Sequence, residues 1–341
     1  MGFLDFFARR RPAFEATVLA PDRLDAAIEA VIDRVDPKLR LASDYNARLG
    51  PAIERFVVAA REQVDRIPPA HVATPDAWVT DPELHAFFAT ANDLVTLVSR
   101  APKVTEFFRA NPGVASACAL LGMSVQARQV LGTVLEGEVL RQDVPQETLS
   151  FGDHRINRVA ADEPAMREAL VRALGEQVLI EVLAEIDLAH ARLKRLRDER
   201  SLLASQFRVL QSRSGMMAAL SSDAEHAEEL AAAKAAVDAV DAQLRESGAG
   251  TKTLDRQLDL LAKLVGDPRK SIRFELREVR LDRMNIVVPE SSPEPAATVR
   301  YVYLSAGTVK PRAGAIALLT IPRDTLRALE SRVSEAVRSL G

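Results

Sequence analysis

A repeating pattern of apolar residues between positions 179 and 265 constrains the fold of this 341-residue chain more than any other feature. Over residues 179–210, apolar side chains recur at alternating spacings of three and four residues, with Arg200 as the one charged member of the series. The same spacing returns over residues 230–244 and, after a short break, over residues 254–265. Such a series forms the seam along which two helices pack. We therefore predict two helical arms joined by a reversal.

The charges of the two arms are complementary. Over residues 188–213 the first arm has seven basic residues against two acidic ones, and over residues 223–246 the second has seven acidic residues against two basic ones. Folding the arms back on each other also sets large apolar residues of the first opposite small ones of the second. Opposite charge and matched size favour pairing within one chain. The prediction is a protruding antiparallel coiled-coil hairpin over residues 163–266, with its reversal within residues 212–222.

The composition sets limits on location and partners. Lysine and arginine total 45 and aspartate and glutamate total 48, so net charge gives no general attraction to nucleic acid or anionic lipid. The single cysteine, Cys118, excludes an internal disulfide and fits a reducing compartment. No apolar run reaches the roughly 20 residues that span a bilayer, and the amino-terminal charges follow the short apolar segment, unlike those of a secretory signal. We therefore expect a cytoplasmic protein.

The rest of the chain separates into helical and strand-rich segments. Residues 21–112 show helical periodicity interrupted by prolines and predict a compact helical subdomain. Short apolar runs between turn signals favour strands over residues 113–162, although residues 115–132 also fit a helix rich in small residues. Strands are predicted again over residues 267–322, and a last helix over residues 323–341.

The strand-rich segments lie on both sides of the hairpin in sequence. In the first strand after it, apolar and charged residues alternate from Ile272, and the alternation slips at Glu278, which predicts a β-bulge. The economical arrangement is one antiparallel sheet into which the hairpin is inserted. The predicted fold class is thus α+β and mostly helical, with an amino-terminal helical subdomain, an antiparallel sheet, the protruding hairpin and a carboxy-terminal helix.

The first 20 residues form an apolar and basic segment that has two interpretations. Large apolar residues precede a cluster of arginines, in the order Phe3, Leu4, Phe6, Phe7, Arg9, Arg10 and Arg11. In one interpretation the apolar side chains insert at an anionic membrane surface and the arginines meet its head groups. In the other, the phenylalanines pack into the core of the protein itself.

No motif for catalysis, a cofactor or a metal stands out in the sequence. The five histidines are scattered singly, and none lies at a spacing that forms a recognised metal-ligand set. We therefore assign no catalytic residue, no metal and no cofactor. The alternative function is that of an enzyme with a pocket between the helical and sheet subdomains, for which the candidate residues are Asp143, Asp153 and His154.

The end of the hairpin is the strongest candidate for a partner-binding surface. Met216, Met217 and Leu220 place adaptable apolar side chains where no core of the same chain easily covers them. They could also simply continue the seam around the turn. The basic first arm suggests nucleic-acid binding as a further alternative, which the acidic second arm opposes by neutralising its charge. The leading hypothesis is a non-enzymatic interaction or scaffolding protein that binds a protein partner or a second copy of itself through the hairpin.

Overall fold

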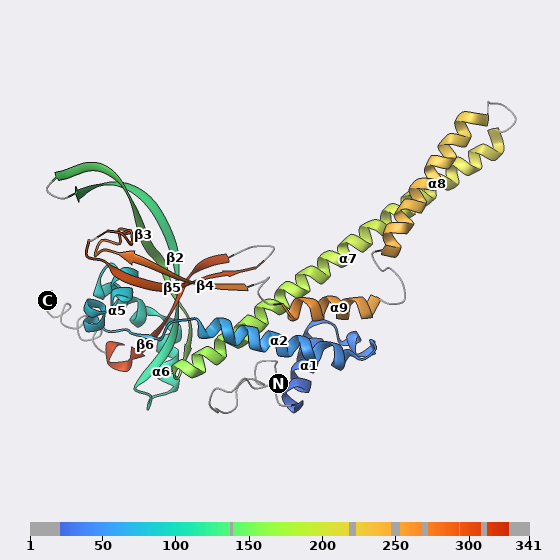
Figure 1. Cartoon of the computed structure of the whole chain (residues 1–341). Helices are drawn as coiled ribbons and strands as arrows, with labels where there is room; N and C mark the ends of the chain where they lie inside the picture. The colour runs from blue at the N-terminus through green and yellow to red at the C-terminus, as the bar shows by residue number, and fades with distance from the viewer. Residues whose placement is uncertain are drawn as a thin grey trace, which may run out of the picture. The chain divides into compact units, whose positions relative to one another are not determined.

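The fold is of the α+β class, and of the residues that the structure describes, 59% lie in helices and 26% in strands. The computed structural model (Figure 1) describes residues 21–136, 139–217, 223–246, 253–267, 272–292, 294–307 and 312–326. It does not describe the side chains of residues 133–142 and 213–226.

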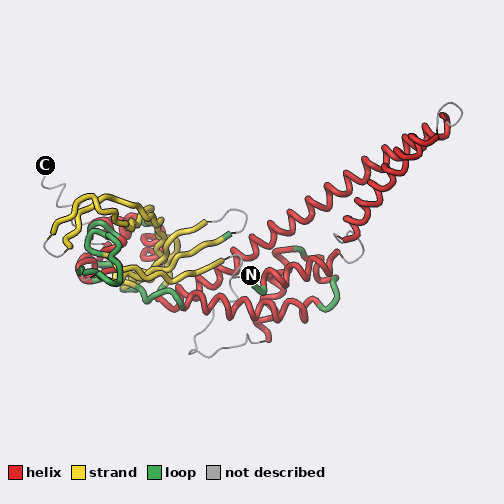
Figure 2. The backbone as a smooth tube through the Cα atoms, turned by 45° about the horizontal axis from the view of Figure 1, so that its top comes forward, coloured by secondary structure: helices red, strands yellow, loops and turns green. Residues whose placement is uncertain are grey.

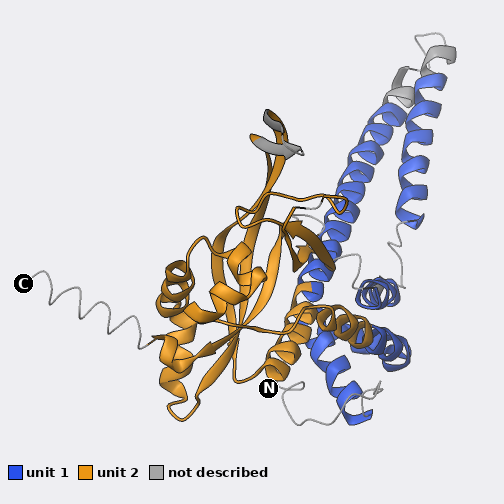
Figure 3. Cartoon of the chain, turned by 60° about the vertical axis from the view of Figure 1, so that its left-hand side comes forward, with its two compact units in different colours: residues 1–6, 14–55, 178–267 blue, residues 7–13, 56–177, 268–341 orange. Residues whose placement is uncertain are grey.

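The chain divides into two compact units, which Figure 3 colours separately. Among the described residues, the first, here called the helical unit, comprises residues 21–55 and 178–267, and the second, the sheet unit, comprises residues 56–177 and 272–326. Helices α2 (Tyr45–Asp65) and α7 (Glu163–Met217) each contribute residues to both units. The domain boundaries drawn from the sequence stay a prediction.

A six-stranded sheet forms the centre of the sheet unit. Its spatial order is β3 (Val139–Ala160), β2 (Ser116–Glu136), β6 (Arg312–Pro322), β5 (Ala297–Ala306) and β4 (Ile272–Leu281), each antiparallel to its neighbour. The short β1 (His71–Val72) pairs in parallel with β6. An antiparallel sheet that draws strands from both sides of the hairpin segment is therefore confirmed.

Strands β2 and β3 are much longer than the short runs expected from the sequence. They pair along almost their whole length, with register shifts between Leu120 and Leu121, between Gly122 and Ser124, and between Gly132 and Val134. Residues that resemble turn signals are accommodated as irregularities within continuous strands, since a bulge bends a strand without ending it. The alternative of a helix over residues 115–132 is wrong.

Strand β4 is regular, so the bulge predicted at Glu278 is wrong. Its pairing with β5 runs without a shift from Ile272 opposite Ala306 to Leu281 opposite Ala297. The apolar pattern changes register because the two halves of the strand bury opposite faces. Ile272 and Phe274 are buried on one side, and Leu281 on the other. The slip in the apolar alternation of β4 therefore reflects a change in which face of the strand is buried, and not the extra residue of a β-bulge.

The segment that follows β4 contacts both outer strands of the sheet. Val287 forms a bridge with Leu281 of β4 and donates its backbone N–H to the carbonyl of Glu147 in β3, at 2.8 Å. Leu149 of β3 donates to the carbonyl of Asn285 at 2.9 Å. Val288 donates its backbone N–H to the carbonyl of Arg280 in β4 at 2.9 Å, so residues 285–288 pair with both outer strands of the sheet.

Four short helices pack against one face of this sheet: α3 (Pro75–Thr80), α4 (Pro82–Phe87), α5 (Ala91–Arg100) and α6 (Pro102–Ala110). Thr74, Asp81 and Thr90 cap the first three of them by accepting hydrogen bonds from backbone N–H groups of the first turn. Alternate residues of β2 and β6 meet these helices in one core, which includes Ala117, Ala119, Leu121, Met123, Ala315, Ala317, Leu319 and Ile321.

Arg167, at the start of α7, joins two segments of the sheet unit. Its guanidinium donates to the carbonyls of Val64 at 2.7 Å and Ile67 at 2.8 Å, which lie at and just beyond the end of α2. Its Nε also donates to Glu163 at 2.9 Å. Because the last carbonyls of a helix have no partner within the helix, Arg167 acts as a side-chain cap for α2.

The helical unit contains α1 (Pro21–Val35), the 3-10 helix η2 (Pro37–Leu41), the first half of α2, most of α7, and helices α8 (Asp223–Glu246) and α9 (Thr253–Val265). Arg48 of α2 forms ion pairs with Asp255 and Asp259 of α9. Leu258 and Leu261 of α9 are fully buried. Helix α9 therefore packs as part of the core of this unit.

None of the helices in the described part of the chain is long and apolar enough to cross a membrane. Residues 323–326 are helical, and the rest of the predicted carboxy-terminal helix lies outside the described residues.

Candidate functional site

Helices α7 and α8 run alongside each other in Figures 1 and 2. Arg200, the charged member of the predicted seam, forms an ion pair with Asp241 of α8. This pair lowers the pKa of the Asp241 carboxyl, because its hydrogen bond with Arg200 favours the charged form. Helix α7 extends through Met217, and residues 218–222, in the predicted region of the reversal, lie outside the described residues.

Burial along the two helices follows the predicted seam. In α7 beyond residue 187, the less exposed side chains include Leu193, Leu196, Leu203, Phe207 and Leu210, while most of their neighbours are exposed. In α8, Val240 and Leu244 are buried. Most seam residues are only half-buried, as expected for two helices that share one narrow contact.

A second apolar line lies on α7, away from the seam. Leu188, Leu202 and Val209 are exposed to 56%, 58% and 55%. Their spacing is a multiple of seven residues, so they follow one line along the helix, in which the exposed Arg195 stands between Leu188 and Leu202. At 3.6 residues per turn this line lies about 130° around α7 from the middle of the seam. Nothing in the described part of the chain covers these three side chains.

The outward face of α8 is different in character. Its exposed residues away from the seam are mostly small, and include Ala231, Ala232, Ala235, Ala239 and Ala242. Glu228 and Asp238 are also exposed there, whereas Lys194, Arg195 and Arg208 are exposed on α7. Helix α7 therefore presents large apolar side chains among more basic than acidic ones, although Asp198 and Glu199 are also exposed, while α8 presents mostly small side chains.

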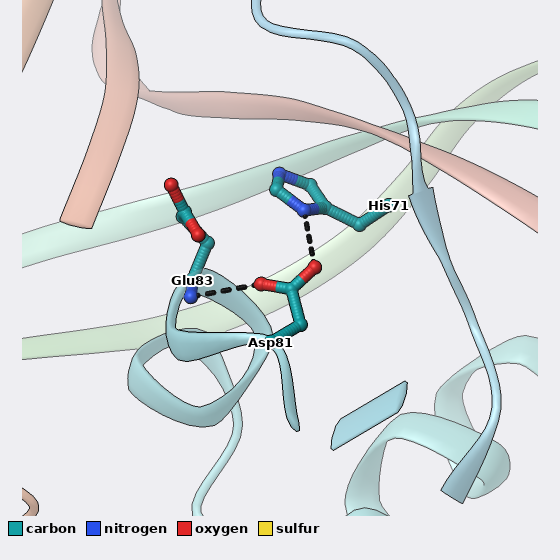
Figure 4. A group of neighbouring side chains, drawn as sticks. All are labelled: His71, Asp81 and Glu83. Carbon is teal, nitrogen blue, oxygen red and sulfur yellow. Dashed lines mark hydrogen bonds and ion pairs between the residues drawn. The ribbon is translucent and has the colours of Figure 1, made fainter. Parts of the chain in front are cut away.

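A separate cluster of His71, Asp81 and Glu83 lies in the sheet unit, and Figure 4 shows it in detail. His71 belongs to β1, Asp81 caps α4, and Glu83 lies in the first turn of α4. The imidazole Nδ1 of His71 lies 2.7 Å from Oδ2 of Asp81. The other oxygen of Asp81 accepts hydrogen bonds from the N–H groups of Glu83 and Leu84, at 2.9 and 3.1 Å.

The cluster brings two carboxyl groups together at a largely buried position. Glu83 is only 7% exposed, and the side chain of His71 is only 11% exposed. Arg300 of β5 approaches Glu83 at 3.3 Å, with half of its own side chain in solvent. Burial alone would raise the pKa of Asp81, but the hydrogen bond and charge of His71 outweigh it and leave this pKa below its ordinary value. One imidazole and two carboxylates could hold a divalent metal ion.

The sequence did not indicate this cluster. His71 and Asp81 are ten residues apart along the chain, which is no recognised ligand spacing. A two-residue strand has no detectable alternation, so the pairing of β1 with β6 that positions His71 could not be predicted.

The three residues considered for an enzyme are not brought together in one site. Asp143 and Asp153 are both exposed and lie ten positions apart on the same extended strand. The contacts of His154 are structural. Its Nε2–H donates to the carbonyl of Phe87 at 2.7 Å, and its ring stacks on that of Phe88 with the ring centres 4.6 Å apart.

A surface groove between α6 and β3 contains none of these three residues. Its volume is about 520 Å³, and its lining includes Lys103, Phe107 and Asn157. Lys103 is already engaged, because it donates to the backbone carbonyl of Asn157 at 2.6 Å.

Other sequence candidates lie where the structure gives no description. The side chains of Met216 and Met217 and the whole of Leu220 are outside the described residues. So is the complete amino-terminal segment that contains the phenylalanines and arginines of the predicted membrane contact. Both surfaces stay predictions.

Comparison with known proteins adds no relative. The scan against protein-family models finds no match, and neither do the searches of curated proteins and of solved structures. Function therefore has to be inferred from the residues of this chain.

Proposed function

We propose that this chain is a non-enzymatic interaction or scaffolding protein whose α7 and α8 form a coiled-coil hairpin that associates with the hairpin of a second copy. The observation that carries the proposal is the exposed apolar line of Leu188, Leu202 and Val209 on α7. Large apolar side chains aligned on an exposed helix face are typical of a helix that packs against another helix.

The size of the side chains favours a second copy as the partner. The alanines on the outward face of α8 allow another helix to approach closely, and the large residues of α7 supply the volume that such a contact needs. In a two-fold arrangement α7 of each copy packs on α8 of the other, so the contact forms twice. The product is a four-helix bundle made of two hairpins.

The charges favour the same pairing. The exposed basic residues Lys194, Arg195 and Arg208 on α7 would meet Glu228 and Asp238 on α8 of the second copy. Complementary charges of this kind select the partner and its orientation more than they add affinity. Helix α8 has 24 residues and is about 36 Å long, which allows an extended contact.

The test is the oligomeric state of the full chain, measured by sedimentation equilibrium over a range of micromolar concentrations. We expect a dimer for the unchanged chain and for Ser201→Glu, and dissociation for Leu202→Glu. The two variants add the same charge at adjacent positions, but only Leu202 belongs to the apolar line. Two leucine side chains at about 1.5 kcal/mol each correspond to a roughly 100-fold weaker dimer.

Far-UV circular dichroism checks that both variants keep the helical content of the unchanged chain. A monomer at all concentrations, or equal dimerisation of Leu202→Glu and Ser201→Glu, would show that this surface does not join two copies. Capture of a different protein by a monomeric chain would leave an interaction role but remove the second copy as the partner.

A further inference from the structure

We infer that His71, Asp81 and Glu83 form a binding site for a divalent transition-metal ion of the zinc type. One possible ligand atom from each of the three side chains lies within 4.8 Å of the other two (Figure 4). The site lies in the sheet unit and does not depend on the association of the α7–α8 hairpins.

Two of the three ligands, His71 on β1 and Asp81 at the start of α4, are held in place by backbone interactions. His71 is fixed by the pairing of β1 with β6, in which it lies opposite Leu319. Asp81 is fixed because one of its oxygens accepts two backbone N–H groups of α4, which leaves the other oxygen directed at His71. A metal site needs such support, because ligands that are already ordered lose little freedom when the ion binds.

The electrostatic situation favours a cation at this point. The carboxyl groups of Asp81 and Glu83 lie close together, and Glu83 is more than nine-tenths buried, so a cation bound here would meet two negative groups that are largely shielded from water. The positive group against Glu83 is Arg300, whose side chain is 51% exposed. An exposed guanidinium compensates buried charge weakly, and it can move into solvent when a divalent ion takes its place.

The pair of His71 and Asp81 requires only a small adjustment to bind an ion, and Glu83 has to approach it from within 4.8 Å. Nδ1 of His71 and Oδ2 of Asp81 are 2.7 Å apart and share a proton in a hydrogen bond. A tetrahedral zinc ion holds nitrogen and oxygen ligands at about 2.0–2.1 Å, which sets the two ligand atoms roughly 3.3 Å apart. The pair therefore has to open by about 0.6 Å, and its proton passes to solvent.

The nature of the ligands indicates which metal they suit. Neutral imidazole suits zinc and other transition metals, while magnesium and calcium prefer oxygen ligands alone. Three protein ligands leave a fourth position of a tetrahedral ion to water or to another molecule. The site thus has the ligand number of zinc sites that bind an exchangeable ligand.

The experiment is isothermal titration of the chelator-treated full chain with zinc chloride, with bound metal counted by mass spectrometry. We expect one zinc ion per chain, and affinity reduced by more than about tenfold in His71→Gln and in Glu83→Gln. Arg300→Gln should bind zinc more tightly, since it removes the group that competes for Glu83. His85→Gln is the matched control, because His85 lies on the same helix as Glu83 but packs edge-on against Trp78 and is outside the cluster.

These results distinguish zinc binding at this site from nonspecific binding of zinc at the protein surface. Circular dichroism confirms that each variant is folded before titration. The inference is overturned if the unchanged chain binds no zinc, or if His71→Gln and Glu83→Gln bind it as well as His85→Gln does. A zinc affinity that Arg300→Gln leaves unchanged overturns it as well.

Discussion

Replacement of Arg167 by methionine should destabilise the sheet unit strongly, although this residue lies in no candidate site. Methionine has a similar length but cannot donate, so the carbonyls of Val64 and Ile67 lose the hydrogen bonds that cap α2. Glu163 also loses its partner on the next turn of the same helix. The change therefore removes one charged group that serves two segments.

The size of this effect follows from the number of bonds and their exposure. A hydrogen bond from a charged donor contributes about 1.5–3 kcal/mol, and two short bonds to backbone carbonyls are lost together with a long one of 3.4 Å to Pro68. The side chain of Arg167 is 21% exposed, so water can partly replace it. We expect a loss of about 3 kcal/mol, which corresponds to a fall in melting temperature of roughly 6–12 °C for a unit of this size.

Differential scanning calorimetry is the appropriate measurement, because a chain with two compact units need not unfold in one step. Arg167→Lys should show an intermediate loss, since one ammonium group cannot reach both carbonyls as the guanidinium fork does. Arg100→Met, at an exposed position of α5, is the control and should change stability by less than about 0.5 kcal/mol. If Arg167→Met behaved like this control, the capping role would be refuted.

Two further predictions concern single residues of the sheet unit. Burial, followed by the negative charge of Glu163, raises the pKa of the Cys118 thiol to about 12, so the folded chain should react slowly with a thiol reagent at pH 8 and completely after unfolding in urea. Rapid reaction of the folded chain would contradict this. His154→Ala should lower the free energy of unfolding by about 1–3 kcal/mol, because it removes the hydrogen bond to Phe87 and the stacking on Phe88. An unchanged urea midpoint would argue against a structural role for His154.

The parts of this fold that could be predicted are those whose signal is local and repeated. The seam of α7 and α8 extends over many turns, and its half-buried residues in the structure, such as Leu196 and Phe207, are those expected from spacing alone. That these helices form a coiled coil is a proposal, but their positions followed from periodicity. The class of the fold followed in the same way from alternating helical and strand-like segments.

The features that could not be predicted depend on long-range contacts or on irregular strands. Gly132 and Asp143 have a weak preference for strands, yet they lie within the continuous strands β2 and β3. The pairing of β2 with β3 compensates for this weak preference. The His71 cluster depends on β1, which exists only because β6 is already there to pair with it. Neither feature has a pattern within a short window of sequence.

The contact of residues 285–287 with both outer strands bears on how this protein avoids aggregation. An unpaired strand at the edge of a sheet offers N–H and carbonyl groups to which a strand of another molecule can add. Here one short segment occupies part of both edges. Along β3, Pro145 has no N–H to offer, and Asp143 has a φ of 60° that turns the backbone away from regular pairing. At these positions neither edge of the sheet is free to accept a strand of another molecule, which opposes edge-to-edge assembly there.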